Sequence, residues 1–321
     1  MKVALVHDYL TQKGGAERVF QLLCNAFPRA DVYTSLYEPK QTVDLGDRQV
    51  YTTALQKVPG AAQNFRMLAP FYYRAFRALD LQAYDLIISS STSFAKGVRK
   101  RPDARHVCFC HNVTRFLWDT NTYLEHFPRY RTFYPFIEKV LAAMRETDYK
   151  FAQEPDLYIA NSTEVARRIH NTYHRKAVVA NYPIDTGQFR FSDSKHDYHL
   201  VASRFLGYKR IDVTIKAFRD LGWPLKVIGE GPEEEYLRSI ASDNIEFLGF
   251  VDDEQRKSLM ANARSVIIAA LEDYGLVPIE ANASGTPSIA FGAGGVLDTQ
   301  VHGKTGLLFK EQTPESLVQA L

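Results

Sequence analysis

The sequence is poor in cysteine and has no hydrophobic run long enough to span a membrane. Its three cysteines, Cys24, Cys108 and Cys110, form no disulfide framework and have no spacing typical of a metal site. The first residues become polar too soon for a signal peptide and are typical of a β-strand. These absences argue against membrane-spanning and disulfide-stabilised secreted proteins, and they predict a reduced, cytoplasmic protein.

Two common ligand motifs are absent as well. The chain has no Gly-x-Gly-x-x-Gly fingerprint, which disfavours a hydride-transfer cofactor. It has no well-placed Asp-x-Asp pair for a metal ion, because Asp252 and Asp253 are predicted to cap a helix. The sequence has no dense stripe of Lys and Arg, and this absence argues against a nucleic-acid partner. We therefore expect no cofactor, no metal ion and no nucleic-acid partner.

Charge is distributed unevenly along the chain. Residues 1–185 hold 25 Lys and Arg against 18 Asp and Glu, and residues 186–321 hold 14 against 19. The balances of +7 and −5 give the net charge of +2. A basic first half favours phosphate-bearing or anionic-lipid partners for that half.

Short apolar segments alternate with amphipathic ones throughout. Strands are predicted at residues 2–7, 31–36, 85–89, 106–110, 156–160, 176–181, 198–203, 225–228, 245–248 and 265–270. Helices are predicted between them, among others at residues 164–173, 211–221, 233–241, 253–263 and 276–284. The polar residues 186–197 are typical of a linker. We expect an α/β fold with two Rossmann-like domains, 1–185 and 186–321, whose parallel sheets face a central cleft.

Candidate binding residues follow the predicted strands, where parallel sheets bind ligands. Gly14 and Gly15 open a helix after the first strand, and glycines there let backbone approach a phosphate or sugar closely. An ordinary turn explains the pair equally well. His111 directly follows the strand at 106–110, and this position favours a sugar contact over a purely structural role.

The second half places two cations in one loop. Arg204 and Lys209 follow its first strand and are expected to converge on a diphosphate, Arg as a fork of donors and Lys as a point charge. Because this half is otherwise acidic, we favour binding over a solvated loop. Gly229 forms a tight turn after the next strand, with a nucleotide contact as its secondary role. Phe250 follows a further strand, where its backbone is expected to meet a base edge.

Glu272 and Glu280 lie at the two ends of a Glu-x7-Glu segment. The segment follows an apolar strand, and a helix is predicted to begin at Leu276, after Gly275. Backbone N–H groups at a helix start attract phosphate. Tyr274, Gly275 and Leu276 are therefore expected to contact a phosphate-bearing ligand. Two carboxylates beside an anion-binding helix end suit a ligand with both hydroxyls and phosphates, such as a nucleotide sugar.

Two segments, residues 59–79 and 127–136, interleave aromatic side chains with arginine. This composition is compatible with contact to a membrane surface. A helix that packs its apolar face on its own sheet is the commoner explanation, and both interpretations stay open.

Together these motifs resemble family 4 of the retaining glycosyltransferases, which have the two-Rossmann GT-B fold. The resemblance covers nearly the whole chain. It implies that the diphosphate is neutralised by Arg204 and Lys209, that Glu272 lies beside the donor sugar and that Glu280 holds the ribose. The second domain would then bind the nucleotide sugar, and the first would bind the acceptor.

In the first domain, the resemblance implies that Gly14 and Gly15 close on the donor and that His111 lies near the transferred sugar. The stretches around His7 and His111 are similar to a bacterial subgroup that includes mannosyltransferases of surface-polysaccharide assembly. This similarity favours GDP-mannose as the donor, with a UDP-sugar as the alternative. The implied acceptor is a glycan or a polyprenyl-linked sugar, and the implied location is the cytoplasm, with the first domain as the place of any peripheral contact with the inner face of a membrane.

Other classes stay open. An epimerase or a phosphorylase on the same fold fits the motifs, as does a catalytically idle protein that binds nucleotide sugars. Family members usually continue with a last helix that crosses back to the first domain, whereas this sequence stops at Leu321 within a helix predicted from Pro314. We therefore expect the second domain to be truncated.

Overall fold

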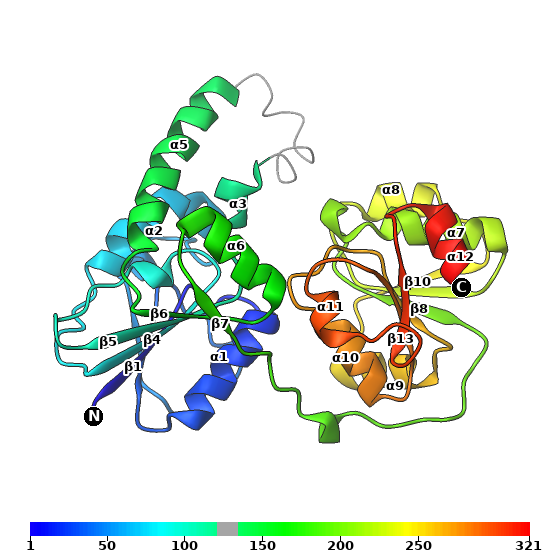
Figure 1. Cartoon of the computed structure of the whole chain (residues 1–321), viewed down its shortest axis with the longest axis horizontal. Coiled ribbons are helices and arrows are strands. Elements are labelled where there is room, and N and C mark those ends of the chain that lie inside the picture. Colours follow the sequence, from blue (N-terminus) through cyan, green and yellow to red (C-terminus); the bar gives the residue numbers. More distant parts are fainter. Residues whose placement is uncertain (121–133) are drawn as a thin grey trace. The chain divides into compact units, whose positions relative to one another are not determined.

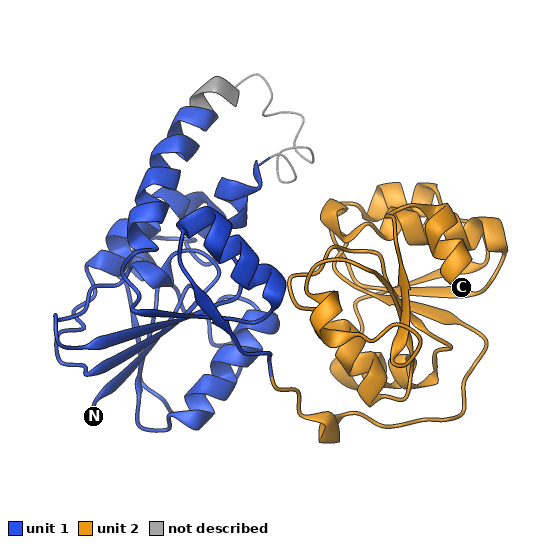
Figure 2. Cartoon of the chain, viewed as in Figure 1, with its two compact units in different colours: residues 1–182 blue, residues 183–321 orange. Residues whose placement is uncertain are grey.

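A computed structural model describes residues 1–120 and 134–321 of the chain. These residues form two compact units, Met1–Tyr182 (unit 1) and Pro183–Leu321 (unit 2) (Figure 2). Each unit has one parallel sheet with helices on both faces (Figure 1). The predicted fold class, α/β with two Rossmann-like domains, is confirmed.

The sheet of unit 1 has seven strands in the order β3-β2-β1-β4-β5-β6-β7. The strands are β1 (Val3–His7), β2 (Asp31–Thr34), β3 (Val50–Thr52), β4 (Leu86–Ser91), β5 (Arg105–Cys110), β6 (Leu157–Ala160) and β7 (Ala177–Val179). The helices are α1 (Gly15–Ala26), α2 (Ala69–Arg77), α3 (Arg115–Trp118), α5 (Tyr134–Phe151) and α6 (Thr163–Tyr173), with short 3₁₀ turns η1 (Ala54–Lys57), η2 (Phe65–Leu68) and η3 (Ala95–Gly97).

Different helices cover the two faces of this sheet. Successive strand residues point to opposite faces, so Ala4 and Val6 pack in the core beneath α2 and α5, whereas Leu5 packs with α1. A third cluster joins β5 and β6 to α6 through Val165 and Ile169. Burial on both faces explains the continuous apolar runs in β1 and in the first half of β4.

Unit 2 repeats this plan with six strands in the order β10-β9-β8-β11-β12-β13. They are β8 (His199–Ala202), β9 (Leu225–Ile228), β10 (Ile245–Gly249), β11 (Val266–Ile268), β12 (Ser288–Phe291) and β13 (Gly306–Phe309). The other elements are η5 (Thr186–Gln188), η6 (Gly207–Lys209), α7 (Ile211–Leu221), α8 (Glu234–Ser239), α9 (Asp253–Asn262), α10 (Leu276–Ala283), α11 (Val296–Thr299) and α12 (Pro314–Ala320). One core cluster joins the sheet to α7, α8 and α12, and another joins it to α9, α10 and α11.

Most predicted elements agree with the structure to within a few residues, and the cap predicted at Asp252 is present, as is a second one at Ser162. Ser162 and Asp252 each accept a hydrogen bond from the backbone N–H three residues later. The strands β3, β12 and β13 are missing from the prediction. The aromatic segment predicted at 127–136 lies outside the residues whose side chains are described.

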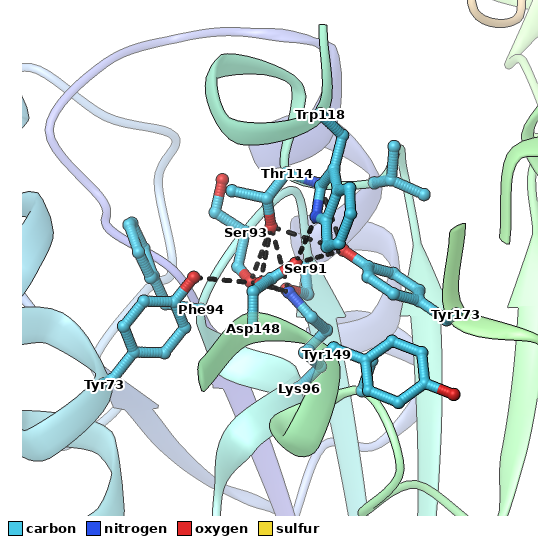
Figure 3. A network of polar contacts seen from close by, with 12 residues as sticks. Tyr73, Ser91, Ser93, Phe94, Lys96, Thr114, Trp118, Asp148, Tyr149 and Tyr173 are labelled. Atoms are coloured by element: carbon cyan, nitrogen blue, oxygen red, sulfur yellow. Dashed lines mark hydrogen bonds and ion pairs between the residues drawn. The ribbon is translucent and has the colours of Figure 1, made fainter. Parts of the chain in front are cut away.

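A buried carboxylate, Asp148 of α5, holds much of unit 1 together (Figure 3). Its side chain is fully buried, and Lys96 of η3, itself 2% exposed, pairs with it at 2.6 Å. Four further donors converge on the two carboxylate oxygens at 2.7–2.9 Å: Tyr73, Thr114, Trp118 and Tyr173. These side chains come from α2, the loop after β5, α3 and α6. One charge therefore fixes five segments relative to one another.

We expect Asp148→Asn to lower the free energy of unfolding of unit 1 by about 3–5 kcal/mol, because it leaves the ammonium of Lys96 buried without its counter-charge. Urea unfolding can be followed through Trp118 alone in a Trp223→Phe background, since the chain has two tryptophans. Glu146→Gln on the same helix is the control. Glu146 pairs with Lys150 in solvent, where an ion pair adds little to stability, so its loss should leave the urea midpoint almost unchanged. Equal effects of the two changes would contradict the role of Asp148.

Candidate active site

Both sheets reverse their strand order beside the first strand of the unit, between β1 and β4 in unit 1 and between β8 and β11 in unit 2. In open parallel sheets, ligands bind outside the carboxyl ends of the strands at such a switch point. The predicted site residues follow β1 and β5 in unit 1, and β8, β9, β10 and β11 in unit 2. Each unit therefore carries its own set of predicted residues at the carboxyl edge of its sheet.

In unit 1, Gly14 is the N-cap of α1 and Gly15 is its first residue. A Cβ atom on Gly14 would lie 2.5 Å from Oε2 of Glu17, which is 2% exposed. Oε1 of Glu17 accepts from Gln12, while Oε2 is buried without a hydrogen-bond partner among the described residues. The glycine loop is thus folded directly over a buried carboxylate, which explains why a side chain is excluded at position 14.

His111 belongs to a chain of buried polar groups at the carboxyl edge of the sheet. Oγ of Ser90 on β4 lies 3.0 Å from Nδ1 of His7 and 2.7 Å from Nε2 of His111. Nδ1 of His111 contacts the hydroxyl of Tyr182, which also accepts a hydrogen bond from Asn161 at 2.9 Å. Both ring nitrogens of His111 therefore have protein partners.

The protonation of this chain follows from burial. His111 is 5% exposed, and burial, with the nearby charge of His7, lowers its pKa to about 3. Burial acts to raise the pKa of Glu17, but the hydrogen bond and charge of His7 outweigh it and hold this pKa below its usual value. At neutral pH His111 is thus an uncharged imidazole that donates through one nitrogen and accepts through the other.

Asp8 fixes the neighbouring loop after β4. It is 1% exposed, and its two oxygens accept the backbone N–H groups of residues 92, 93, 94 and 95 at 2.6–2.8 Å. Burial acts to raise its pKa, but the charge of His7 and these hydrogen bonds keep the pKa below its usual value. Asp8 is therefore a structural anion that shapes the edge beside His7.

In unit 2, Arg204 lies in the exposed loop after β8 and donates a long hydrogen bond of 3.5 Å to Tyr208. Gly229 after β9 lets this loop pass closely. Its φ is +132°, and a Cβ atom would lie 1.9 Å from the carbonyl oxygen of Ser203. Gly229 is thus required by backbone geometry, as its predicted turn role suggests. Phe250 after β10 is 77% exposed, so its ring, as well as its backbone, is available for stacking.

Lys209 and Glu272, both predicted site residues, are brought together by the fold. Lys209 ends η6, Glu272 follows β11, and Nζ lies 2.8 Å from Oε1 with both side chains largely buried. Burial acts to lower the pKa of Lys209, but the charge of Glu272 outweighs it and raises the pKa. A bound phosphate would therefore meet a cation that is already paired with a carboxylate.

The segment from Glu272 into α10 is held by backbone contacts. The N–H of Gly295 donates to the carbonyl of Glu272 at 2.8 Å, and a Cβ on Gly295 would lie 2.1 Å from the carbonyl oxygen of Asp273. Tyr274 is buried, Gly275 is the N-cap of α10 with a φ of +92°, and Leu276 is its first residue. The predicted helix start is therefore where the sequence places it, with its N–H groups at the carboxyl edge of the sheet.

Glu280, by contrast, does not join the pair of Lys209 and Glu272. It lies on α10, is 6% exposed, and its Oε2 is 2.5 Å from Nη1 of Arg256 on α9. Arg256 is absent from the predicted site, as are Ser90, Tyr182 and Asn161. None of these four residues belongs to a recognisable sequence motif, so only the fold shows which residue each of them contacts.

Within the described residues, no helix is long and apolar enough to cross a bilayer. No group of three or more His, Cys, Asp or Glu side chains there is arranged to hold a metal ion.

Comparison with known proteins identifies the family. The profile of Glycosyltransferase Family 4 matches residues 13–188, more than half of the chain, and that of Glycosyl transferases group 1 matches residues 188–321. The chain belongs to Glycosyltransferase Family 4. The boundary between the two profiles lies within η5.

An uncharacterized glycosyltransferase of Methanocaldococcus jannaschii is 23% identical over 179 residues, which cover 54% of this chain and 51% of the relative. A glycogen synthase of Pseudomonas savastanoi pv. phaseolicola is 31% identical over 160 residues, 47% of this chain and 33% of the relative. The chain thus spans about half, or about a third, of the length of these curated relatives.

Solved structures are similar over the whole chain. Anabaena HepE in complex with UDP has a TM-score of 0.71 at 20% identity, covering 99% of this chain and 88% of that one. Sucrose-phosphate synthase from Thermosynechococcus elongatus has a TM-score of 0.74 at 17% identity, covering 100% and 88%. At these identities the likeness shows the fold, which is GT-B.

Proposed function

We propose that this chain is a retaining, metal-independent glycosyltransferase that moves a hexose from a nucleotide sugar to a glycan or lipid-linked acceptor. The observation that carries the proposal is the pairing of Lys209 with Glu272 at the carboxyl edge of the unit 2 sheet, in a chain of Glycosyltransferase Family 4. A cation, a carboxylate and the start of α10 follow strands that end at one sheet edge. These groups suit a ligand that carries phosphates at one end and hydroxyls at the other.

In this proposal unit 2 binds the donor. Arg204, Lys209 and the N–H groups at Leu276 neutralise the diphosphate, and Glu272 lies beside the donor sugar. Glu280 accepts hydrogen bonds from the ribose. The exposed ring of Phe250 adds a stacking surface for the base beside the backbone contact predicted there.

Unit 1 completes the site in this proposal. Gly14 and Gly15 approach the donor with their backbone, and His111 contacts the transferred sugar. Both ring nitrogens of His111 already have hydroxyl partners, Ser90 and Tyr182, so a sugar hydroxyl must replace one of them. The neutral imidazole can donate to, or accept from, the hydroxyl that takes its place.

The chemistry would be electrostatic. As the bond between sugar and phosphate breaks, negative charge grows on the diphosphate, and the fixed cations and helix start stabilise it. The leaving phosphate oxygen takes the proton of the attacking hydroxyl on the same face of the sugar, which retains the configuration. No cofactor takes part in these steps.

GDP-mannose is the favoured donor, and a UDP-sugar is the alternative. We expect GDP and GDP-mannose at about a hundred times their Kd to raise the midpoint of thermal unfolding by on the order of 5 °C. UDP and ADP at the same concentrations should raise this midpoint less. A larger shift with UDP than with GDP would mean that the donor carries uracil and not guanine. An absence of shift with every nucleotide would remove the donor site itself.

Arg204→Ala should lower kcat/KM for sugar transfer by about 10²–10³ while leaving thermal unfolding unchanged, because an exposed donor to the leaving group is lost. Arg219→Ala, which removes an exposed cation from α7, is the matched control and should transfer sugar like the parent. Product analysis without acceptor separates transfer from epimerisation. Unchanged turnover in Arg204→Ala would show that Arg204 does not stabilise the leaving diphosphate.

Unit 1 is also proposed to touch an anionic membrane where a lipid-linked acceptor would be presented. On η2 and α2, Met67 is 77% exposed and Phe71 is 59% exposed, and Arg66 and Arg74 are exposed on the same two elements. The opposite side of α2 packs in the core. An open groove of about 610 Å³ continues this surface to α5, and it is lined by Pro70, Tyr73, Arg74, Lys139, Val140, Ala143, Met144, Thr147 and Phe151.

The double change Met67→Ser and Phe71→Ser should weaken binding to vesicles that contain anionic lipid by at least about tenfold, because two apolar side chains no longer enter the interface. Co-sedimentation at low salt measures this. Leu22→Ser, at an exposed apolar position on α1, should leave binding unchanged. If the double variant binds the vesicles as tightly as the parent chain, the membrane contact is wrong.

A further inference from the structure

Glu280 is a buried carboxylate with an unusual support. Its residue is 6% exposed, and its Oε2 lies 2.5 Å from Nη1 of Arg256, on the neighbouring helix α9. Charge-assisted hydrogen bonds of this length are among the stronger polar contacts in proteins. The contact therefore fixes the orientation of the carboxylate plane of Glu280.

Arg256 is itself held in place by its own helix. Its Nε and Nη2 lie 3.2 and 2.9 Å from Oδ1 of Asp253, whose other oxygen is 2.9 Å from Nζ of Lys257. The guanidinium thus binds Asp253 with one edge and Glu280 with the opposite end. A planar fork held at both ends has little conformational freedom left to lose.

We propose that Arg256 is a positioning residue for recognition of the donor's ribose, acting through Glu280. This inference rests on the proposed function, in which Glu280 accepts the ribose hydroxyls. Arg256 approaches the carboxylate at Oε2, from the neighbouring helix α9. The orientation of the carboxylate is therefore set before the nucleotide arrives. Pre-set acceptors bind a vicinal diol more tightly, because less side-chain entropy is lost on binding.

The test is a cycle of two proteins and two nucleotides. Isothermal titration calorimetry on the full chain compares the parent with Arg256→Met, using GDP or UDP, whichever the parent binds more tightly, and its 2′,3′-dideoxy analogue. Arg256→Met should weaken binding of the intact nucleotide on the order of tenfold, within the usual coupling between members of one hydrogen-bond network. It should leave binding of the dideoxy analogue within about twofold of the parent.

Lys257→Met is the matched control. It removes the other cation on Asp253, and Lys257 forms ion pairs with Asp253 and Glu254 on its own helix, so both nucleotides should bind the variant like the parent. Arg256→Lys keeps a positive charge near Glu280 and should recover part of the loss. Equal weakening of both nucleotides, or none, would overturn the inference while leaving the donor site intact. A parent chain that binds neither nucleotide would overturn the inference together with the proposed function.

Discussion

Unit 1 depends on charge that is buried and fully compensated. Asp148 gathers donors from five segments, and Asp8 gathers four consecutive backbone N–H groups after β4. Burying a carboxylate costs several kcal/mol unless its lone pairs are satisfied, so each segment is held where its donor is needed. His111 begins the loop after β5, which Asp148 holds through Thr114, and Asp8 holds the loop after β4. The rigidity of the predicted site residues in unit 1 is thus inherited from buried anions.

Unit 2 uses charge in a different way. Lys209 and Arg256 each pair with a carboxylate while a small part of the cationic side chain, 16% and 18%, stays exposed. Pairs of this kind hold the side chains in one conformation, so less side-chain entropy is lost when a ligand binds. In the proposed function, a phosphate would have to interact with Lys209 more favourably than Glu272 already does.

The sequence was sufficient for the fold class, because parallel strands buried on both faces give unmistakable apolar runs between helices. Lys209 and Glu272, both predicted from their places after strands, lie side by side because the ends of parallel strands lie at one edge, while their role stays a prediction. The sequence could not predict the contacts of Arg256, Ser90 or Tyr182, because each of these residues contacts a partner that is distant in the sequence. Nor could it show that Phe71 is exposed while Tyr72 beside it is buried, because both suit an amphipathic helix equally.

The close packing of backbone around Gly229 and Gly295 has a consequence for redesign. Carbonyl oxygens of Ser203 and Asp273 fill the space that any side chain at these two glycines would need. The shape of the loops that carry Arg204 and Glu272 is therefore set by main chain against main chain, and substitution at the glycines cannot tune it gradually. A library intended to change the specificity of these loops should therefore leave both glycines unchanged. It should vary solvent-facing positions such as Phe250, where the side chain is exposed and can be exchanged without a backbone clash.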